Sequence, residues 1–282
     1  MTIYVAGNAV NLNGQPSGDQ VYTGTLSLTP AAVSGNRPAI QASDGVVNGA
    51  TFQPGIVSGS WATIRGENLA QTTRIWSGSD FNNGQAPTVL DGVRVSIDGK
   101  PAAIYYISPG QINVQTPITD KLGPVTVEVT NANGTSNTAS GEVRRAAPGW
   151  FLFEPEGRKY IAGAFNDGTY LGKPGLFGSN ATTRPAAPGD VIVLFGANFG
   201  PTNPPLPEGR ESSGLSPLVE TPTVRVGGMP AVVQYGGGAP GQIGSYQFNL
   251  VVPNLPNGDY EVVAEIGGVR TQANAMITVQ QR

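Results

Sequence analysis

The stretches SGSWATIRGENLA, residues 58–70, and PGDVIVLFGANFG, residues 188–200, carry the same pattern of small, apolar and polar residues. Three pairs of residues recur 130 positions apart: Gly59 and Gly189, Gly66 and Gly196, Asn68 and Asn198. Internal similarity at a fixed spacing indicates a repeated structural unit, and it changes every later assignment. We therefore read the chain as two copies of one unit.

Three further blocks recur in the same order. They are VRVSIDGKPAAIYY (93–106) with VRVGGMPAVVQY (224–235), QINVQTP (111–117) with QFNLVVP (247–253), and GPVTVEVTNANG (123–134) with GDYEVVAEIGG (258–268). The spacing rises from 129 residues between Pro101 and Pro230 to 136 residues between Asn113 and Asn249. Copy two therefore carries an insertion of seven residues, which we place within residues 236–246.

The repeated blocks read as short strands. Val93, Val95 and Ile97 alternate with polar residues, which gives a strand one buried and one solvated face. Asp98-Gly99 follows and marks a hairpin turn. About seven such strands per copy, with turns every 8–12 residues and no amphipathic helix of useful length, are typical of an immunoglobulin-like sandwich. The sequence predicts an all-β fold: two tandem immunoglobulin-like β-sandwiches with an N-terminal β extension.

We predict three segments: the N-terminal β extension at residues 1–44, the first sandwich at 45–147 and the second at 148–282. In the extension, TIYVAGNAV (2–10) and QVYTGTLSLTP (20–30) look like strands without an obvious partner. They either complete the first sandwich or belong to a larger upstream domain.

Composition argues against several partners. Only 12% of the residues are charged, the net charge is −3, and no basic cluster exceeds the pair Arg144–Arg145, so we expect no nucleic-acid binding. No run of about 18 apolar residues is present, so we expect no membrane span. No basic-then-apolar leader opens the chain. The protein is then either cytosolic or the mature form of an exported bacterial protein. We favour the second and expect a location outside the cell or on the cell surface.

The chain contains no His and no Cys. This composition excludes Ser–His–Asp triads, histidine metal ligands, thiolate sites and disulfides. The acidic residues of the loops show no spacing that pairs them for acid–base catalysis. We therefore expect a protein that is not an enzyme and needs no cofactor or metal. A hydrolase using carboxylates alone is the weakest alternative.

The blocks quoted above, together with VVNGATFQPG (46–55) and AAPGWF (146–151), resemble an uncharacterised C-terminal module of acidobacterial, Solibacter-type proteins. The resemblance covers roughly residues 46–280, and PGQINVQTP (109–117) is its most specific part. Each half is also similar to the IPT/TIG immunoglobulin-like domains of surface receptors. The resemblance implies a module that follows larger domains in exported proteins. It implies no catalytic residues.

One loop is peculiar to copy one. RIWSGSDFNNGQ, residues 74–85, places Trp76 and Phe81 beside Arg74 and Asp80, and we predict a ligand site from these four residues. An aromatic platform beside amide and carboxylate groups suits a carbohydrate. The alternative is that Trp76 closes the end of the sandwich or the seam between domains. Asp80-Phe81-Asn82 has a faint likeness to a calcium loop, but the other ligands of such a loop are missing.

Three other features have structural interpretations. The pairs Gln111/Asn113 and Gln247/Asn249 recur in both copies, so we assign them to the scaffold. We expect Trp150 at the domain junction. Residues 200–215 of copy two are rich in proline, and we predict a stiff surface loop.

The leading functional hypothesis is a non-catalytic extracellular structural or adhesive module: a spacer or an assembly subunit that contacts other protein subunits or cell-surface components. In a filament-forming variant, the strand-like segments of residues 1–28 would add to a neighbour's exposed edge. The alternative is a carbohydrate-binding module of a secreted protein, with polysaccharide as its partner.

Overall fold

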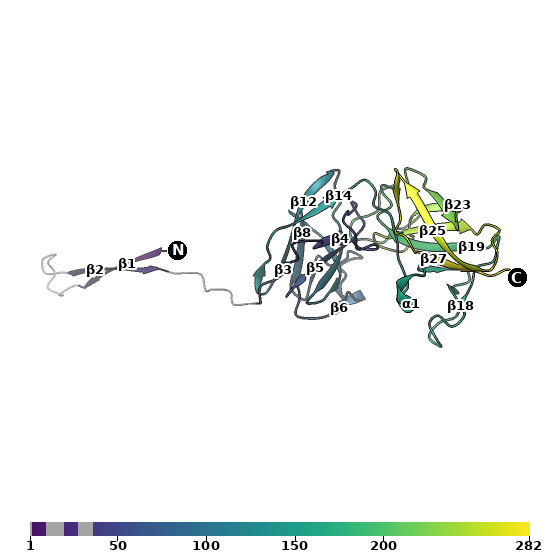
Figure 1. Ribbon diagram of the computed structural model, residues 1–282. Coiled ribbons are helices and arrows are strands. Elements are labelled where there is room, and N and C mark those ends of the chain that lie inside the picture. Colours follow the sequence, from purple (N-terminus) through teal and green to yellow (C-terminus); the bar gives the residue numbers. More distant parts are fainter. Residues whose placement is uncertain (1, 10–19, 28–35) are drawn as a thin grey trace. The chain divides into compact units, whose positions relative to one another are not determined.

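The computed structural model describes residues 2–9, 20–27 and 36–282, and it divides the chain into two compact units between Asn36 and Arg37 (Figure 1). In the first unit, β1 (Thr2–Ala9) pairs antiparallel with β2 (Gln20–Ser27), and the two strands form a sheet of their own. The sequence predicted both strands without an obvious partner. Each is the partner of the other.

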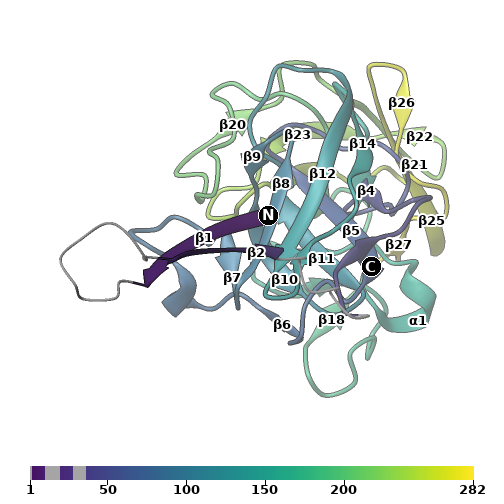
Figure 2. The same ribbon diagram turned by 90° about the vertical axis from the view of Figure 1, so that its left-hand side faces the viewer.

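The second unit begins with a sandwich of two sheets. One has the strand order β3-β5-β11-β10-β6, with β4 also on β5; the other has the order β13-β12-β8-β7, with β14 on β12 and β9 on β8. Figure 2 shows β8, β12 and β14 side by side. The elements are β3 (Ala39–Ile40), β4 (Val46–Asn48), β5 (Trp61–Glu67), β6 (Arg74–Ile75), the 3-10 helix η1 (Gly78–Asp80), β7 (Val89–Leu90), β8 (Val93–Ile97), β9 (Lys100–Pro101), β10 (Ala103–Ile107), β11 (Gln111–Gln115), β12 (Gly123–Asn131), β13 (Gly134–Thr135) and β14 (Ala139–Val143).

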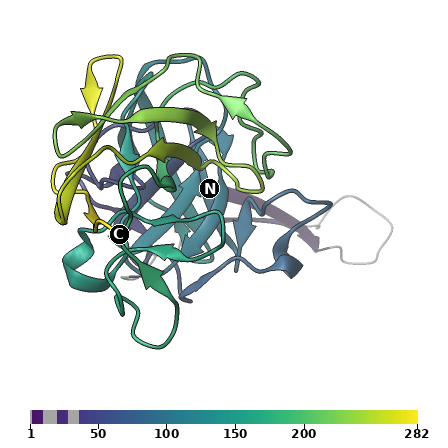
Figure 3. The ribbon, with the colours of Figure 1, turned by 90° about the vertical axis from the view of Figure 1, so that its right-hand side faces the viewer.

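A second sandwich follows in the same unit and faces the viewer in green and yellow in Figure 3. Its sheets have the orders β18-β17-β16-β19-β24-β23-β20, with β15 on β19, and β22-β21-β25-β26, with β27 on β25. The elements are β15 (Gly149–Trp150), the helical turn α1 (Pro155–Arg158), β16 (Gly163–Ala164), β17 (Tyr170–Leu171), β18 (Thr183–Arg184), β19 (Val191–Ala197), β20 (Ser216–Pro217), β21 (Thr223–Val226), β22 (Met229–Pro230), β23 (Val232–Gly238), β24 (Tyr246–Val251), β25 (Gly258–Ile266), β26 (Val269–Arg270) and β27 (Met276–Val279).

The predicted fold class is confirmed, and local sequence explains it. Val93, Val95 and Ile97 are buried on β8, as their alternation predicted. Asp98 and Gly99 both have positive φ, 51° and 77°, which is what the tight turn from β8 to β9 requires. Each sandwich encloses a hydrophobic core of its own, built from the inward-facing residues of its two sheets.

Strand pairing repeats between the copies. The order β5-β11-β10 in the first sandwich corresponds to β19-β24-β23 in the second. The pairing register shifts between Ile104 and Tyr106 in β10 and between Val233 and Tyr235 in β23, which are equivalent positions. A β-bulge of this kind adds one residue to a strand and redirects its side chains. Both sandwiches therefore carry the same irregularity at the same place.

The repeated glycines mark where the first strand of each sandwich meets its neighbour. Ala39–Ile40 pairs with β5, and a β-carbon at Gly66 would overlap the carbonyl oxygen of Ala39. A β-carbon at Gly196 would likewise overlap the carbonyl oxygen of Gly149 in β15. Residues 37–44, which we predicted as the end of the extension, thus contribute β3 to the first sandwich.

The described helices are η1 and α1, and neither is long and apolar enough to cross a membrane. Trp150 does not lie at the domain junction as predicted. Its side chain is fully buried in the core of the second sandwich, against Phe199 and Phe248. The short apolar segment around Trp150 pairs with β19 and turns the indole inward.

Candidate ligand-binding cleft between the sandwiches

Asn198 joins the two sandwiches. Its side chain is completely buried; Oδ1 accepts a hydrogen bond from the backbone N–H of Val57 at 2.9 Å, and Nδ2 donates to the carbonyl of Trp61 at 2.9 Å. The backbone N–H of Asn198 donates to Oγ of Ser60, also at 2.9 Å. One residue of the second sandwich thus satisfies three polar groups of the first. Buried groups of this kind are costly to leave unpaired.

Gln115 makes the reciprocal connection from the first sandwich. It is 1% exposed; Nε2 donates to the carbonyls of Gly59, at 2.8 Å, and Pro207, at 3.1 Å, while Oε1 accepts from the N–H of Gly209 at 2.7 Å. Residues 200–215 were predicted as a surface loop. That prediction is wrong for the part around residues 206–209, because the side chain of Gln115 hydrogen-bonds the backbone of Pro207 and Gly209 and so holds this part of the loop against the first sandwich.

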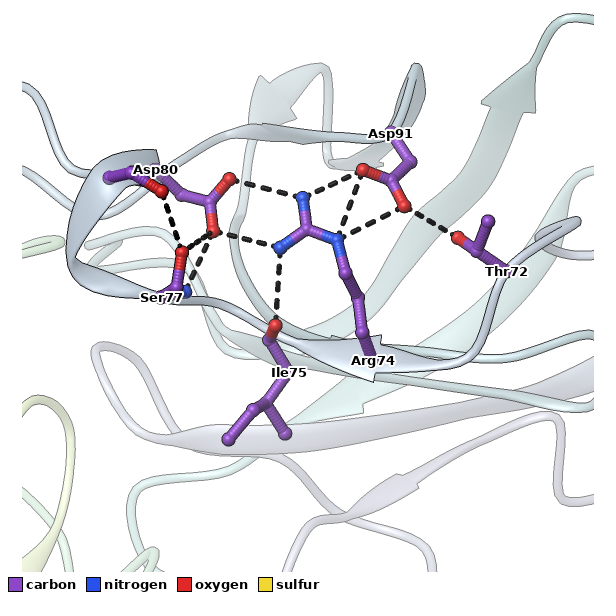
Figure 4. Close-up of polar contacts among 7 residues, drawn as sticks. Thr72, Arg74, Ile75, Ser77, Asp80 and Asp91 are labelled. Carbon is purple, nitrogen blue, oxygen red and sulfur yellow. Dashed lines mark hydrogen bonds and ion pairs between the residues drawn. The ribbon is translucent and has the colours of Figure 1, made fainter.

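A loop near the junction is held by one arginine (Figure 4). Arg74 on β6 donates through Nη1 and Nη2 to both carboxylate oxygens of Asp80, at 2.8 and 3.0 Å. Its Nε and Nη2 also donate to Asp91, at 3.0 and 2.7 Å. Such two-pronged arginine–carboxylate pairs fix geometry as well as contributing energy. Arg74 therefore connects the first residue of the 74–85 loop to Asp80 in the middle of the loop and to Asp91 after its end.

These contacts shift the ionisation of the two carboxyls. The hydrogen bonds from Arg74, together with those from Ser77, hold the pKa of Asp80 well below its usual range. Arg74 and the Thr72 hydroxyl also lower the pKa of Asp91. The arginine and the first aspartate, both predicted as ligand contacts, are thus occupied with each other. We assign them to positioning the loop that carries Trp76 and Phe81.

This arrangement predicts how the loop responds to acid. Because the pKa of Asp80 is lowered in the folded chain, its contribution is complete above the unfolded value of about 3.9 and is lost as the pH falls through the folded value. We expect the near-ultraviolet circular dichroism of the neighbouring aromatic side chains to stay constant from pH 8 to about pH 4 and to change only below it. In Asp80→Asn the signal should differ already at neutral pH. A transition of the native chain between pH 5 and 7 would contradict the assignment.

The loop brings an aromatic cluster together. The ring of Trp76 lies 5.0 Å from Tyr105, 5.1 Å from Phe81 and 5.9 Å from Trp61, measured between centroids. Trp61 also contacts Tyr105 at 5.6 Å. The interplanar angles lie between 57° and 78°, so none of these four rings is stacked face to face on another. Edge-on packing is the favoured geometry for aromatic pairs.

The cluster forms one wall of a cleft of about 390 Å³ between the two sandwiches. The other wall comes from the second sandwich, where Gln242, Ile243 and Ser245 belong to the insertion in copy two. The indole N–H of Trp61 donates to the carbonyl of Ile243 at 2.9 Å and to Oγ of Ser245 at 3.1 Å. Trp61 therefore joins the two walls by hydrogen bonds.

Two of the four predicted site residues, Trp76 and Phe81, line the cleft, whereas Arg74 and Asp80 do not. Sequence reasoning missed Trp61 and Tyr105. A comparison of the two copies could have found them, because both are aromatic in copy one, whereas the equivalent positions of copy two hold Val191 and Gln234. The cluster of four aromatic rings belongs to copy one, and the second sandwich adds Phe151 to the lining of the cleft.

The amide pairs bond within themselves. Gln111 donates to Oδ1 of Asn113 at 2.8 Å, and Gln247 donates to Oδ1 of Asn249 at 2.9 Å. This repetition supports the scaffold role that we predicted for them. Asn113 also lines the cleft.

One family model matches part of the chain. The IPT/TIG domain model matches residues 52–143, which lie in the first sandwich. No curated protein sequence matches the chain. The resemblance to the acidobacterial module stays a prediction, because the domain match concerns the immunoglobulin-like fold alone.

The solved structures that match the chain are distant. The glycan-binding protein SGBP-B of a Bacteroides ovatus mixed-linkage glucan locus is 12% identical with a TM-score of 0.33, and the match covers 100% of this chain and 53% of that one. SGBP-B of a Bacteroides uniformis xyloglucan locus is 10% identical over 86% of this chain and 48% of its own, with a TM-score of 0.24. The D0–D1 domain of intimin is 12% identical, with a TM-score of 0.24 and coverage of 84% and 97%. This chain thus spans about half the length of both SGBP-B structures, and the scores are too low to transfer a function.

Proposed function

We propose that the chain is a non-catalytic structural or adhesive module on the outside of a bacterial cell, in which the two sandwiches act as one rigid spacer. The observation that carries this proposal is the buried seam formed by Asn198 and Gln115. Domains of one chain usually move against each other unless their interface is extensive. Here both amide side chains pair with backbone groups of the opposite sandwich, so bending at the seam would break several buried hydrogen bonds at once.

Composition supports the remaining parts of the proposal. The chain lacks His and Cys, which removes the commonest catalytic side chains. Its low content of charged residues, 12%, is common among exported β-proteins. In a filament-forming variant of this function, β1 and β2 supply strands that add to a neighbouring molecule. Size-exclusion chromatography with light scattering distinguishes a monomeric spacer from such an assembly.

Rigidity can be measured directly because the chain has no cysteine of its own. Thr126→Cys in the first sandwich and Thr223→Cys in the second place one spin label on each exposed strand surface. We expect pulsed electron paramagnetic resonance to give a single narrow distance distribution, since the seam permits one arrangement. The same label pair in Asn198→Ala should give a broader distribution. A broad or bimodal distribution in the otherwise native chain would overturn the spacer function.

A further inference from the structure

The cleft is built where the two copies differ. The aromatic loop, residues 74–85, has no counterpart of similar composition in copy two. The opposite wall comes from residues 241–245 together with Phe151 and Glu211. The connection of copy one that corresponds to residues 239–245 is the short turn of residues 108–110. A scaffold device should recur in both copies, as the bulge and the amide pairs do. Segments peculiar to each copy that converge on one cleft point instead to a function placed on the scaffold.

The aromatic wall offers a ligand the ring surface of Trp76 and one hydrogen-bond donor, the indole N–H of Trp76. Trp76 is half-buried, and its rings meet the neighbouring aromatic rings at steep angles. The indole N–H of Trp61 donates to Ile243 and Ser245, whereas that of Trp76 makes no hydrogen bond to any residue that the structure describes. Trp76 therefore combines an apolar face with an unused donor at the cleft.

Polar groups with spare capacity stand beside this wall. Oδ1 of Asn113 accepts from Thr63 and Gln111, but Nδ2 has no partner among the described residues. The side-chain amide of Gln242 and the carboxylate of Glu211 also make no hydrogen bond within the described part of the chain. The cleft thus offers donors and acceptors at fixed positions around an aromatic surface.

Charge narrows the class of ligand. No Lys or Arg lines this cleft, and its one charged side chain is the exposed carboxylate of Glu211. An anionic ligand would meet a like charge and find no cation to pair with. A volume of about 390 Å³ lies within the range of small-molecule sites and exceeds what a small organic cation needs. A neutral sugar presents apolar ring faces and, at its edges, hydroxyl groups. The ring faces can pack on the aromatic wall, and the hydroxyl groups can bond to the amides beside it.

We propose that this cleft binds a neutral saccharide, with a sugar ring packed on Trp76 and its hydroxyls bound by Asn113, Gln242 and Glu211. The inference goes beyond the spacer function: it requires the two sandwiches to meet at the seam but not that the seam is rigid. Because the sugar would contact both sandwiches, the site is complete only while the seam is closed. The competing view is that Trp76 and its neighbours merely plug the seam.

Binding is tested with soluble probes on the full chain. The neutral probes are cellohexaose, xylohexaose, mannohexaose and maltohexaose; the charged ones are hexagalacturonate and tetramethylammonium. We expect at least one neutral hexasaccharide to give a saturable isothermal titration, and the charged probes to give none. Trp76→Ala should lower the association constant for that saccharide by at least tenfold. Tyr170→Ala removes an exposed aromatic ring of the second sandwich, away from the cleft, and should leave binding unchanged.

Gln242→Ala provides a variant that does not disturb the aromatic cluster, and we expect it to weaken binding several-fold with unchanged thermal unfolding. Failure of all four neutral probes would overturn the proposal. Binding of hexagalacturonate or tetramethylammonium in preference to every neutral probe would overturn it as well, as would saccharide binding that neither Trp76→Ala nor Gln242→Ala alters. None of these results bears on the rigidity measurement, so the saccharide site and the spacer function fail separately.

Discussion

Replacing Trp150 with alanine should lower the free energy of unfolding by about 3–5 kcal/mol, the range for deleting a large buried aromatic side chain. The indole is 0% exposed and lies 5.0 Å from Phe199 and 5.1 Å from Phe248, between ring centroids. Its N–H donates to the carbonyl of Val262 at 3.0 Å. The substitution therefore opens a cavity and also leaves a buried carbonyl without its partner. Urea unfolding followed by far-ultraviolet circular dichroism measures the loss.

Two variants separate these contributions. Trp150→Phe keeps an aromatic ring but not the donor, so it should cost less than the alanine variant. Trp76→Ala removes an indole of the same size from a half-buried position and should cost less still. Equal losses from the alanine substitutions at positions 150 and 76 would contradict the distinction between a core tryptophan and a cleft tryptophan.

Asn198→Ala should lower the free energy of unfolding by about 2–5 kcal/mol, because one buried backbone N–H loses its partner at about 1–3 kcal/mol and alanine in a left-handed backbone adds about 1–2 kcal/mol of strain. The group left unpaired is the N–H of Val57, whereas the carbonyl of Trp61 keeps the hydrogen bond from the N–H of Gly49 at 3.0 Å. The backbone φ of Asn198 is 64°, a value that asparagine adopts more readily than alanine. Chemical unfolding monitored by circular dichroism measures the change.

The repeat supplies a matched control. Asn68 occupies the equivalent position of copy one, has a φ of 54° and is exposed, and its side chain makes no hydrogen bond to the described residues. Asn68→Ala should therefore show the backbone strain alone, about 1–2 kcal/mol. The difference between the two variants isolates the seam. If both lost the same amount, the side-chain bonds of Asn198 would contribute nothing to stability.

Local pattern was sufficient to predict the strands. The alternation of Val93, Val95 and Ile97 identified a half-buried strand, and Asp98-Gly99 identified its turn, because both signals depend on neighbours in the sequence. The junction between sandwiches could not be found in this way. Asn68 and Asn198 look alike in sequence because both occupy a left-handed turn. What each side chain contacts depends on which segment folds against it.

The candidate site was predicted in part for a similar reason. Composition singled out the loop around Trp76 and Phe81, and both residues line the cleft. Arg74 and Asp80 had the chemistry of ligand contacts, but each satisfies the other in the folded loop. Spacing in an irregular loop does not reveal such a pair. The opposite wall depends on how the insertion of copy two folds, which periodicity does not describe.

The bulge shared by β10 and β23 decides which residues these strands bury. A bulge shifts every later side chain of its strand to the other face, so it cannot be gained without changing which residues point inward. In β10 the shift leaves Ile104 and Ile107, which are three residues apart, both in the core of the first sandwich. In a strand without the bulge, Ile107 would point away from that core. The irregularity is therefore a requirement of the packing.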